Sequence, residues 1–489
     1  MPTFPQRLLT RLEHVPTEGQ HKAIDALSRL LATEKDRATL VLKGYAGTGK
    51  TTLVGALVKV LAEARKPVVL LAPTGRAAKV LSAYAGASAS TIHRRIYRTS
   101  GDADGGYGGI SVAPNKEQHA LFVVDEASMI GKGGGGAFDR DLLADLFQHV
   151  FSSPGNKLLL IGDPAQLPPV GSDHSPALEV KDLADQGLLA GSIELTDVVR
   201  QAEASGILVN ATALRGTLAS MPLTEQAGFG TVPVPEEEKI IPQFITGFDD
   251  VVRVEGYDLQ DALEEAYARH GDEEVCLICR SNKRAYQYSQ QVRARIHAFE
   301  EELETNDRLM VVKNNYFWAA RENGPRSFGL IANGEQVTVQ RVHGTEERYG
   351  LRFADLTIVW WDGREDRELE VKVILDVLAS EGPALAGARM RQLSQDVLAG
   401  LVARTKAERF RLFKQDPYAN ALQVKYAYAV TCHKAQGGQW KSVFVDQGYV
   451  TEEMIDREYV RWLYTAVTRA SEKLYLLNFH PRFFGEGEE

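Results

Sequence analysis

The first third of the chain carries short apolar runs that each end in small or polar residues. The runs are residues 38–42, 68–72, 121–124 and 158–161. Segments with helical spacing separate them, and this pattern predicts a parallel sheet whose two faces are covered by helices. Ligands of such sheets bind at the carboxyl ends of the strands, so the polar residues after each run are the first candidates for a site.

A second series of apolar runs lies in the other half of the chain, at residues 274–279, 424–430, 442–445 and 474–477. It predicts a second α/β unit, with a ligand cleft between the two units. The series is interrupted by two turn signals, Asn333-Gly334 and Asp362-Gly363, in β-branched and aromatic surroundings. We therefore expect a small β-barrel inserted in the second unit, followed by a helical return over residues 386–414.

The first unit is also interrupted, by residues 99–109, which are rich in Gly, Asp and Ser. This stretch predicts a small surface hairpin with Tyr107 near its tip. An exposed ring at such a tip either stacks on a nucleic-acid base or anchors the loop, and the sequence leaves both roles open.

The chain has 489 residues and a formal net charge of −9. Its length predicts about three domains. The charge is uneven, because residues 21–100 contain fourteen Lys or Arg and four Asp or Glu. Local positive charge of this kind suits a protein that holds a nucleic acid in a groove.

The three cysteines do not make a disulfide framework. Cys276 and Cys279 fall in one predicted strand, where residues three apart point to opposite faces, so both are predicted core residues. The longest apolar runs are too short for a membrane span, and the N-terminal residues lack the pattern of a secretory signal. We expect a cytoplasmic protein with no membrane partner.

The strongest motif is Gly44-Tyr45-Ala46-Gly47-Thr48-Gly49-Lys50-Thr51, which lies between a predicted strand and a predicted helix over residues 52–64. This is the phosphate-binding loop of nucleoside triphosphatases. Its glycines let backbone N–H groups turn toward an anion, and the helix N-terminus adds partial positive charge. Lys50 is expected to reach the β- and γ-phosphates, and the Thr51 hydroxyl to hold Mg²⁺.

Four further side chains extend the predicted site. Asp125 is expected to hold Mg²⁺, directly or through water, and Glu126 to polarise the attacking water. Gln166 is a candidate γ-phosphate contact, and Arg469 is a candidate arginine finger from the second unit.

Gln20 has two possible roles. It follows Thr17, the predicted N-cap of a helix over residues 20–31, and a capping turn accounts for it fully. Its amide also both donates and accepts, which suits the edge of an adenine beside the phosphate loop.

Taken together, eight blocks resemble the superfamily 1 DNA helicases of the RecD/Dda-like branch. The blocks are GYAGTGKTT (44–52), LAPTGRAAKVL (71–81), STIH (90–93), VVDEASM (123–129), IGDPAQLPPVG (161–171), LTDVVRQ (195–201), TCHKAQGGQW (431–440) and YTAVTRA (464–470). They follow the family's order over nearly the whole chain. The single late insertion resembles the compact Dda-like layout more than the larger RecD-like one.

The resemblance implies an α/β fold with two RecA-like P-loop motor domains. A short hairpin is expected in the first and a small SH3-like β-barrel in the second. The expected boundaries are 1–97 with 118–194 for the first motor, 98–117 for the hairpin, 195–310 with 416–489 for the second motor, and 311–415 for the barrel with its helical return.

The resemblance also implies an ATP-dependent DNA helicase that moves 5′-to-3′ on single-stranded DNA and unwinds duplex, with ATP and Mg²⁺ as cofactors. It implies Gln20 at the adenine and Arg200 beside Gln166 and Arg469 at the γ-phosphate. The implied phosphate-loop contacts are Gly44, Gly47, Thr48, Gly49, Lys50, Thr51 and Thr52. The implied DNA contacts are Pro73, Thr74, Thr91, His93, Thr431, His433 and Lys434, with Tyr107 as the strand-separating tip.

Single-stranded DNA and single-strand–duplex junctions are the expected partners, and a cleft within one chain makes a monomer sufficient. Two alternatives stay open. One is an ATP-gated nucleic-acid clamp or remodeller without processive unwinding, and the other is a relative that acts on RNA. The residues do not decide between DNA and RNA, because no contact to a 2′-OH is identifiable.

Overall fold

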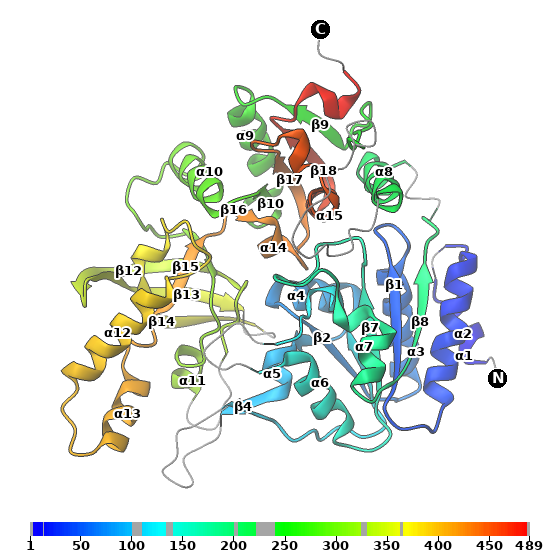
Figure 1. Ribbon diagram of the computed structural model, residues 1–489, viewed down its shortest axis with the longest axis horizontal. Coiled ribbons are helices and arrows are strands. Elements are labelled where there is room, and N and C mark those ends of the chain that lie inside the picture. The colour runs from blue at the N-terminus through cyan, green and yellow to red at the C-terminus, as the bar shows by residue number, and fades with distance from the viewer. Residues whose placement is uncertain are drawn as a thin grey trace.

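The computed structural model describes residues 3–12, 14–99, 110–133, 140–199, 204–221, 240–323, 330–361 and 365–486. Two parallel sheets and a closed β-barrel form the framework (Figure 1). This confirms the predicted α/β class with parallel sheets and the predicted small barrel.

The first sheet has six parallel strands in the order β3-β2-β6-β7-β1-β8. The strands are β1 (Ala38–Gly44), β2 (Val68–Ala72), β3 (Ala89–Thr91), β6 (Leu121–Val124), β7 (Lys157–Gly162) and β8 (Leu189–Leu195). All four predicted runs are strands of this sheet. The two remaining strands, β3 and β8, were not predicted, because β3 is short and β8 is largely exposed.

Helices cover both faces of the first sheet, as the continuous apolar runs predicted. On one face lie α1 (Phe4–Leu9), α2 (Glu18–Ala32), α3 (Lys50–Glu63) and α4 (Gly75–Ala85), and on the other α5 (Ile92–Ile96), α6 (Leu142–Phe151) and α7 (Val180–Asp185). The alternation of strand side chains explains the two layers, because Leu40 and Leu42 pack in the first and Val41 in the second. Thr17 caps α2 as predicted, because its hydroxyl accepts a hydrogen bond from the backbone N–H of Gln20.

Two short strands, β4 (Tyr97–Thr99) and β5 (Ile110–Val112), bound the excursion in the first unit, and they pair antiparallel. This pairing agrees with the predicted hairpin. Tyr107, its predicted tip, lies outside the described residues.

The second sheet has five parallel strands in the order β16-β10-β17-β18-β9. They are β9 (Val251–Val254), β10 (Val275–Cys279), β16 (Ala429–Thr431), β17 (Trp440–Asp446) and β18 (Ala470–Leu477). One face carries α9 (Leu259–His270) and α10 (Asn282–Arg295), and the other carries α8 (Gly206–Ser220), α14 (Cys432–Ala435) and α15 (Arg457–Val467). Cys276 and Cys279 are buried in these two different layers, which confirms their predicted divergence.

The barrel closes through five strands, β11 (Arg308–Val311), β12 (Gln336–Arg348), β13 (Leu351–Trp361), β14 (Asp366–Ile374) and β15 (Leu422–Tyr426). A short helix, α11 (Trp318–Asn323), lies between β11 and β12, and the helical return consists of α12 (Gly387–Gly400) and α13 (Lys406–Gln415). Because β11 and β15 belong to it, the barrel extends beyond the predicted limits of 311 and 415.

One of the two turn predictions in the barrel needs correction. Asp362-Gly363 lies outside the described residues, but β13 and β14 on either side of it pair antiparallel, as that prediction requires. The main hairpin joins β12 to β13 through Tyr349-Gly350, with φ of 55° and 65°. A two-residue turn in which both φ angles are positive usually contains Asn or Asp before Gly. Because Tyr stands at that position here, the sequence pattern does not indicate the turn. Asn333-Gly334 instead leads into β12 without a hairpin of its own. The run 424–430 is likewise two strands, β15 of the barrel and β16 of the second sheet.

The barrel and the second sheet share one core, since apolar residues of the barrel interior pack in the same cluster as α9 and α10. A buried ion pair lies at this boundary. The Arg293 guanidinium of α10 donates to both Asp307 oxygens, at 2.9 and 2.8 Å, and Tyr428 donates to the same carboxylate at 3.0 Å. Within the described residues, no helix combines the length and apolar character needed to cross a membrane.

We expect Asp307→Ala to lower the free energy of unfolding by about 3–5 kcal/mol, because it leaves the Arg293 guanidinium buried without its carboxylate. Urea unfolding followed by circular dichroism measures this loss. The matched control is Asp249→Ala, at an exposed aspartate of the same unit, which should change the midpoint little. Equal unfolding midpoints for the two variants would contradict the predicted contribution of the ion pair to stability.

Candidate functional site

The phosphate loop connects β1 to α3 at the carboxyl end of the first sheet. Gly47 and Gly49 adopt φ of 76° and 80°, a backbone region that residues with a Cβ rarely occupy. The Lys50 ammonium donates to the carbonyl oxygens of Gly44, at 2.5 Å, and Tyr45, at 2.8 Å. The loop therefore curls around a positive charge at the start of a helix, which is the chemistry of a phosphate site.

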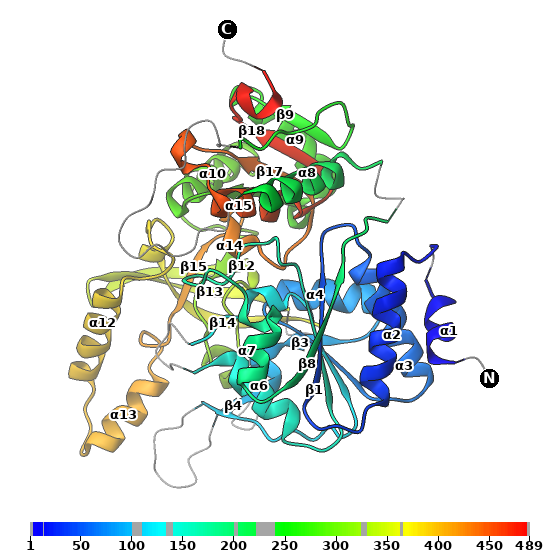
Figure 2. The ribbon, with the colours of Figure 1, turned by 45° about the vertical axis from the view of Figure 1, so that its right-hand side comes forward.

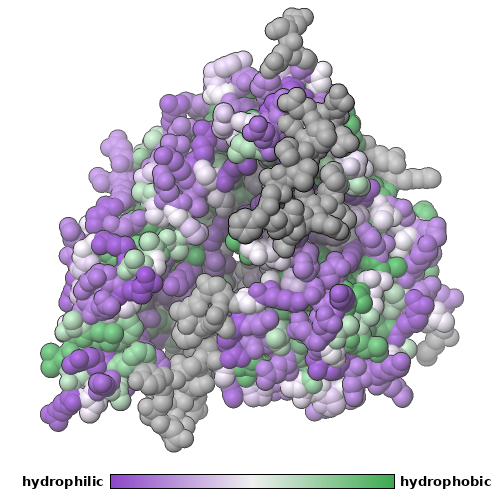
Figure 3. Space-filling view, in the orientation of Figure 1, coloured by the Kyte–Doolittle hydropathy of each residue, from purple (hydrophilic) through white to green (hydrophobic). Residues whose placement is uncertain are grey.

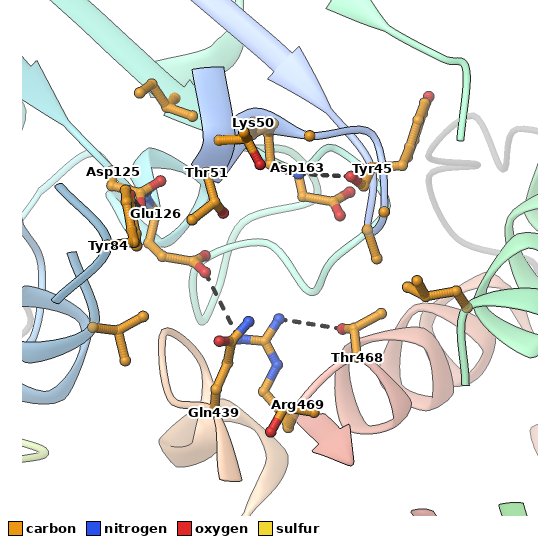
Figure 4. A pocket seen from close by; sticks show the side chains of 18 of the residues that line it. Tyr45, Lys50, Thr51, Tyr84, Asp125, Glu126, Asp163, Gln439, Thr468 and Arg469 are labelled. Atoms are coloured by element: carbon orange, nitrogen blue, oxygen red, sulfur yellow. Dashed lines mark hydrogen bonds and ion pairs between the residues drawn. The ribbon is translucent and has the colours of Figure 1, made fainter. Parts of the chain in front are cut away.

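A cavity of about 500 Å³ opens beside this loop (Figure 4). Both sheets contribute to its wall. The first provides Tyr45, Gly47, Gly49, Lys50, Thr51, Thr52, Asp125, Glu126, Asp163 and Gln166, and the second provides Gly437, Gln439, Thr468 and Arg469. Most of the residues predicted for the nucleotide thus lie around one cavity.

Asp125 and Glu126 follow β6 at a sharp turn in the backbone. Asp125 accepts from the Tyr84 hydroxyl at 2.5 Å and from the Glu126 N–H at 2.9 Å. Glu126 has φ of 52°, in the left-handed region, which turns its carboxylate into the cavity. Burial raises the pKa of Glu126, and the positive charge of Arg469 acts in the opposite direction.

Arg469 reaches this carboxylate from the second sheet. A guanidinium nitrogen lies 3.7 Å from Glu126 Oε1 (Figure 4). The remaining N–H groups donate to the Thr465 carbonyl at 3.0 Å, the Gly438 carbonyl at 3.2 Å and the Thr468 hydroxyl at 3.2 Å. Arg469 follows the last turn of α15 (Arg457–Val467), and this turn directs it across the cavity.

Helix α15 makes a second bridge to the first sheet. The Tyr464 hydroxyl donates to Asp163 at 2.6 Å and accepts from the Ala46 N–H of the phosphate loop at 2.9 Å. Burial raises the pKa of Asp163, and the charge of Lys50 and the hydrogen bond from Tyr464 oppose this. One phenol therefore links the phosphate loop, the loop after β7 and the second unit.

Gln166 lies in the same loop and is buried, with its Oε1 lacking a hydrogen-bond partner among the described residues. Its neighbour Leu167 is held at both backbone groups. The Leu167 N–H donates to Thr465 at 2.9 Å, and its carbonyl accepts from Gln436 at 2.7 Å. The loop is thus fixed by the second unit, with an unpaired amide oxygen beside the cavity.

The Gln20 side chain makes hydrogen bonds within the protein, and its predicted contact with adenine stays a prediction. Its Oε1 accepts from the Thr17 N–H at 3.1 Å and lies 3.0 Å from His14 Nε2, while its Nε2 donates to the Thr48 carbonyl at 3.3 Å. The side chain is fully buried, and a side chain at Gly49 would collide with it. The capping role is therefore present, and the amide also braces the phosphate loop.

The residues predicted for a DNA strand lie at helix starts on both units. Thr74 and Thr91 accept from backbone N–H groups and cap α4 and α5, and Thr431 begins α14. Pro73 precedes Thr74 at the end of β2. Burial lowers the pKa of His93 to about 4.

The segment Asn333-Gly334, before the barrel strand β12, lies between the two groups. Asn333 accepts from the Lys434 ammonium at 2.5 Å. A Cβ at Gly334 would lie 3.7 Å from the Thr74 methyl group. Burial lowers the pKa of Lys434 to about 8, and it also lowers the pKa of His433.

Arg200 lies outside the described residues, so its predicted phosphate contact stays a prediction. Several residues of the cavity and its bridges were not predicted, among them Tyr45, Tyr84, Asp163 and Tyr464. Asp163 and Tyr464 fall inside blocks of known type but gave no separate signal. Tyr84 had none, because a tyrosine near the end of a helix is usually a packing residue.

The cavity fits a nucleoside triphosphate with Mg²⁺. The Thr51 hydroxyl and the Asp125 carboxylate are hard oxygen donors on one wall, and Mg²⁺ commonly takes one or two carboxylates together with phosphate oxygens and water. Within the described residues, no group of three or more His, Cys, Asp or Glu side chains forms a complete protein metal site. The ion would therefore depend on the phosphates of the ligand.

Comparison with known proteins gives two family matches. Residues 16–229 match an AAA domain, and residues 426–477 match the UvrD-like helicase C-terminal domain. The chain is 33% identical over 203 residues to the ATP-dependent RecD2 DNA helicase of Deinococcus radiodurans, covering 41% of this chain and 25% of that protein. It is 31% identical over 164 residues to the ATP-dependent DNA helicase dda of Enterobacteria phage T4, covering 33% of this chain and 34% of that protein.

These matches span between a quarter and about a third of the two relatives. A solved structure of two coordinating Pif1 helicases at forked double-stranded DNA aligns with a TM-score of 0.44 and 16% identity. That alignment covers 95% of this chain and 92% of the other.

We expect Arg469→Ala to destabilise the protein more at pH 8 than at pH 5, by about 1–3 kcal/mol. Without Arg469 the partly buried Glu126 carboxyl keeps a pKa above its unfolded value. The folded state then favours the protonated carboxyl. Its contribution to the free energy of unfolding is present at low pH and is lost as the pH rises through the folded pKa. Urea unfolding at both pH values measures the difference, and adding Glu126→Gln to the same variant should remove it. Arg29→Ala, at an exposed arginine, is the control. If Arg469→Ala lowered the free energy of unfolding equally at pH 5 and pH 8, the pairing of Arg469 with Glu126 would be contradicted.

Proposed function

We propose, on the premise that the chain belongs to the superfamily 1 helicases of the RecD and Dda type, that it couples ATP hydrolysis to 5′-to-3′ movement along single-stranded DNA and to duplex unwinding. Both named relatives are ATP-dependent DNA helicases. The two α/β units act as RecA-like motors, the hairpin and barrel are insertions in them, and a monomer is sufficient.

The observation that carries this proposal is the Glu126–Arg469 pair at 3.7 Å. Glu126 lies beside the phosphate loop of one sheet, and Arg469 belongs to the other sheet. A γ-phosphate between them would attract the arginine and withdraw its charge from the glutamate. Binding and hydrolysis would then change the attraction between the two units, which is the requirement for a motor rather than a simple hydrolase.

The roles at the nucleotide follow from charge and position. Lys50 binds the β- and γ-phosphates, Thr51 and Asp125 hold Mg²⁺, and Glu126 orients and deprotonates the attacking water. Arg469 stabilises the charge that develops on the γ-phosphate, with Arg200 as a second cation. Mg²⁺, when bound, neutralises phosphate charge, and the chain's own residues position the water and the two units.

Gln166 is the γ-phosphate sensor in this proposal, because its buried Oε1 has no hydrogen-bond partner among the residues that the structure describes and its loop is bound to α15. Gln20 lies beside the phosphate loop in this proposal, with both ends of its side-chain amide hydrogen-bonded within the protein. His14 lines the cavity beside Gln20 and is an additional candidate for the base.

The DNA strand would run along the helix starts of both units, over Pro73, Thr74, Thr91, His93, Thr431, His433 and Lys434. Hydroxyl groups and backbone amides at helix starts bind phosphates without reading the base sequence. The pKa of about 4 keeps His93 neutral at physiological pH, so it would act as a hydrogen-bond partner. Lys434 supplies the charge, and Asn333 couples that charge to the barrel.

The decisive experiment compares two partial duplexes, one with a 5′ single-stranded tail and one with a 3′ tail, with and without ATP. We expect ATP-dependent strand separation of the 5′-tailed substrate alone. Separation of only the 3′-tailed substrate would overturn the direction. Failure on both, with ATPase activity still stimulated by single-stranded DNA, would favour the clamp.

Glu126→Gln should keep ATP affinity and lower turnover by about 10²–10⁴-fold, because the amide cannot accept the proton of the attacking water. Single-turnover hydrolysis and equilibrium binding of a fluorescent ATP analogue separate the two effects. Glu265→Gln, at an exposed residue of α9, is the control and should match the wild type. Fast hydrolysis by Glu126→Gln would remove Glu126 from this role.

A further inference from the structure

We infer that Tyr84 is a positioning residue that fixes the metal-facing carboxylate of Asp125, and that helix α4 links this carboxylate to the contact between the two units. The inference rests on the proposed nucleotide site. It adds a residue and a mechanical connection that no sequence block indicates.

The first observation is the geometry at the C-terminal end of α4. The Tyr84 hydroxyl donates to Asp125 Oδ2 at 2.5 Å, and the Glu126 N–H donates to Oδ1 at 2.9 Å. With both oxygens held, the carboxylate cannot rotate about its Cβ–Cγ bond, and its remaining lone pairs keep one direction. A phenol hydroxyl is protonated near neutral pH, so Tyr84 is a donor to the carboxylate. Outer-shell partners of this type orient metal ligands.

The second observation concerns the other end of the same helix. Arg76 donates to the Gln439 carbonyl of the second unit at 2.7 Å and lies 4.1 Å from the Trp440 ring centroid. Gly75 packs so closely on Glu335 of the barrel segment that a Cβ there would lie 2.6 Å from it. The start of α4 is therefore attached to the second unit and the barrel, while its end holds Asp125.

The eleven residues of α4 span about 16 Å, and an intact helix of this length moves as a rigid body. Figures 1 and 2 show α4 at the edge of the first sheet that faces the second unit. A displacement of the second unit moves Arg76 and, through the helix, the hydroxyl of Tyr84. The metal carboxylate would thus respond to the relative position of the two units, which the DNA strand also contacts.

The test is Tyr84→Phe, with Tyr288→Phe as the matched control. Tyr288 likewise donates to an aspartate, Asp446, at 3.0 Å, and neither of these two residues lines the cavity. We expect Tyr84→Phe to weaken Mn²⁺ binding to the ADP complex by about tenfold in electron paramagnetic resonance titrations. The half-saturating Mg²⁺ concentration for ATP hydrolysis should rise by a similar factor, and the control should change neither.

Coupling through α4 is measured by repeating the Mn²⁺ titration with oligo(dT). In the wild type and in Tyr288→Phe, the oligonucleotide should shift the Mn²⁺ affinity; in Tyr84→Phe the shift should disappear. Equal Mn²⁺ affinities in the two variants would overturn the positioning role. An oligonucleotide shift that persists in Tyr84→Phe would overturn the connection through α4. Because Mn²⁺ binding needs no turnover, these results are distinct from a failure of the proposed helicase activity.

An independent observation leads to a second proposal, that the arm formed by residues 387–415 is a binding surface for duplex DNA ahead of the strand-separation point. The arm consists of α12 and α13 and projects from the barrel in both ribbon views. It contains seven Lys or Arg and two Asp or Glu, in a chain whose net charge is −9. This proposal also rests on the proposed function.

Four of the seven cations of the arm are exposed and make no ion pair in the described part of the chain. They are Arg404, Lys406, Arg409 and Arg411. Figure 3 shows hydrophilic side chains interspersed with apolar ones at this corner of the molecule. Phosphate backbones are the partner that such a surface fits, because each neutralised phosphate releases counterions.

The position of the arm favours duplex over the single strand. In Figures 1 and 2 the arm lies beyond the barrel from α14, where the predicted strand contacts are, and at the same end of the molecule as β4. The hairpin that begins at β4 is the predicted strand separator. A duplex that approaches β4 from this end of the molecule would come from the side on which α13 lies.

The test is the charge reversal Arg409→Glu/Arg411→Glu, with Arg29→Glu/Lys59→Glu as a control of equal charge change at exposed positions of α2 and α3. Fluorescence anisotropy with a blunt hairpin duplex should show at least tenfold weaker binding for the arm variant alone and a shallower dependence on salt. Oligo(dT)-stimulated ATPase should stay unchanged in both variants. Equal duplex affinity in the two variants would overturn the proposal. If oligo(dT) did not stimulate the ATPase activity of the wild type, the proposed function would have failed instead.

Discussion

The contact between Glu126 and Arg469 is the interaction on which the cavity depends. Each group alone would be costly to bury, because desolvation of an unpaired charge exceeds what neutral packing returns. At 3.7 Å each lowers this cost for the other, so the carboxyl edges of the two sheets are held at one separation. Tyr464 and Thr465 of the same helix region add neutral hydrogen bonds to the phosphate loop and to Leu167. The geometry of the cavity is thus a property of both units together.

The barrel takes part in the same arrangement. Its interior is continuous with the core of the second unit, while the segment before β12 contacts the first. Glu335 in that segment accepts from Trp360 at 2.5 Å and lies 3.7 Å from Arg94. Burial raises the pKa of Glu335 to about 7, and the charge of Arg94 opposes this. An insertion that looks separate along the chain is therefore a third body in the contact between the units.

Several elements of the fold were predictable because their signals are local. The phosphate loop, the strand before Asp125 and the cap at Thr17 each depend on residues within a few positions of one another. Predictions failed where the signal was unusual or split. Tyr349-Gly350 forms a turn normally marked by Asn or Asp, and the apolar run 424–430 changes sheets at Ala427-Tyr428 without a Gly or Pro. The short strand β3 and the exposed strand β8 lack the apolar run that identifies buried strands.

The sequence by itself determined the class of the fold, the order of its parts and the residue types available for a phosphate and a divalent cation, because periodicity and short motifs record local chemistry. Only the tertiary structure decided which of these side chains meet. It paired Glu126 with Arg469, placed Tyr84 on Asp125 and used the Gln20 amide within the protein. The reason is physical. Such contacts join residues far apart in the chain, and their distances follow from how whole sheets and helices pack, which no local pattern encodes.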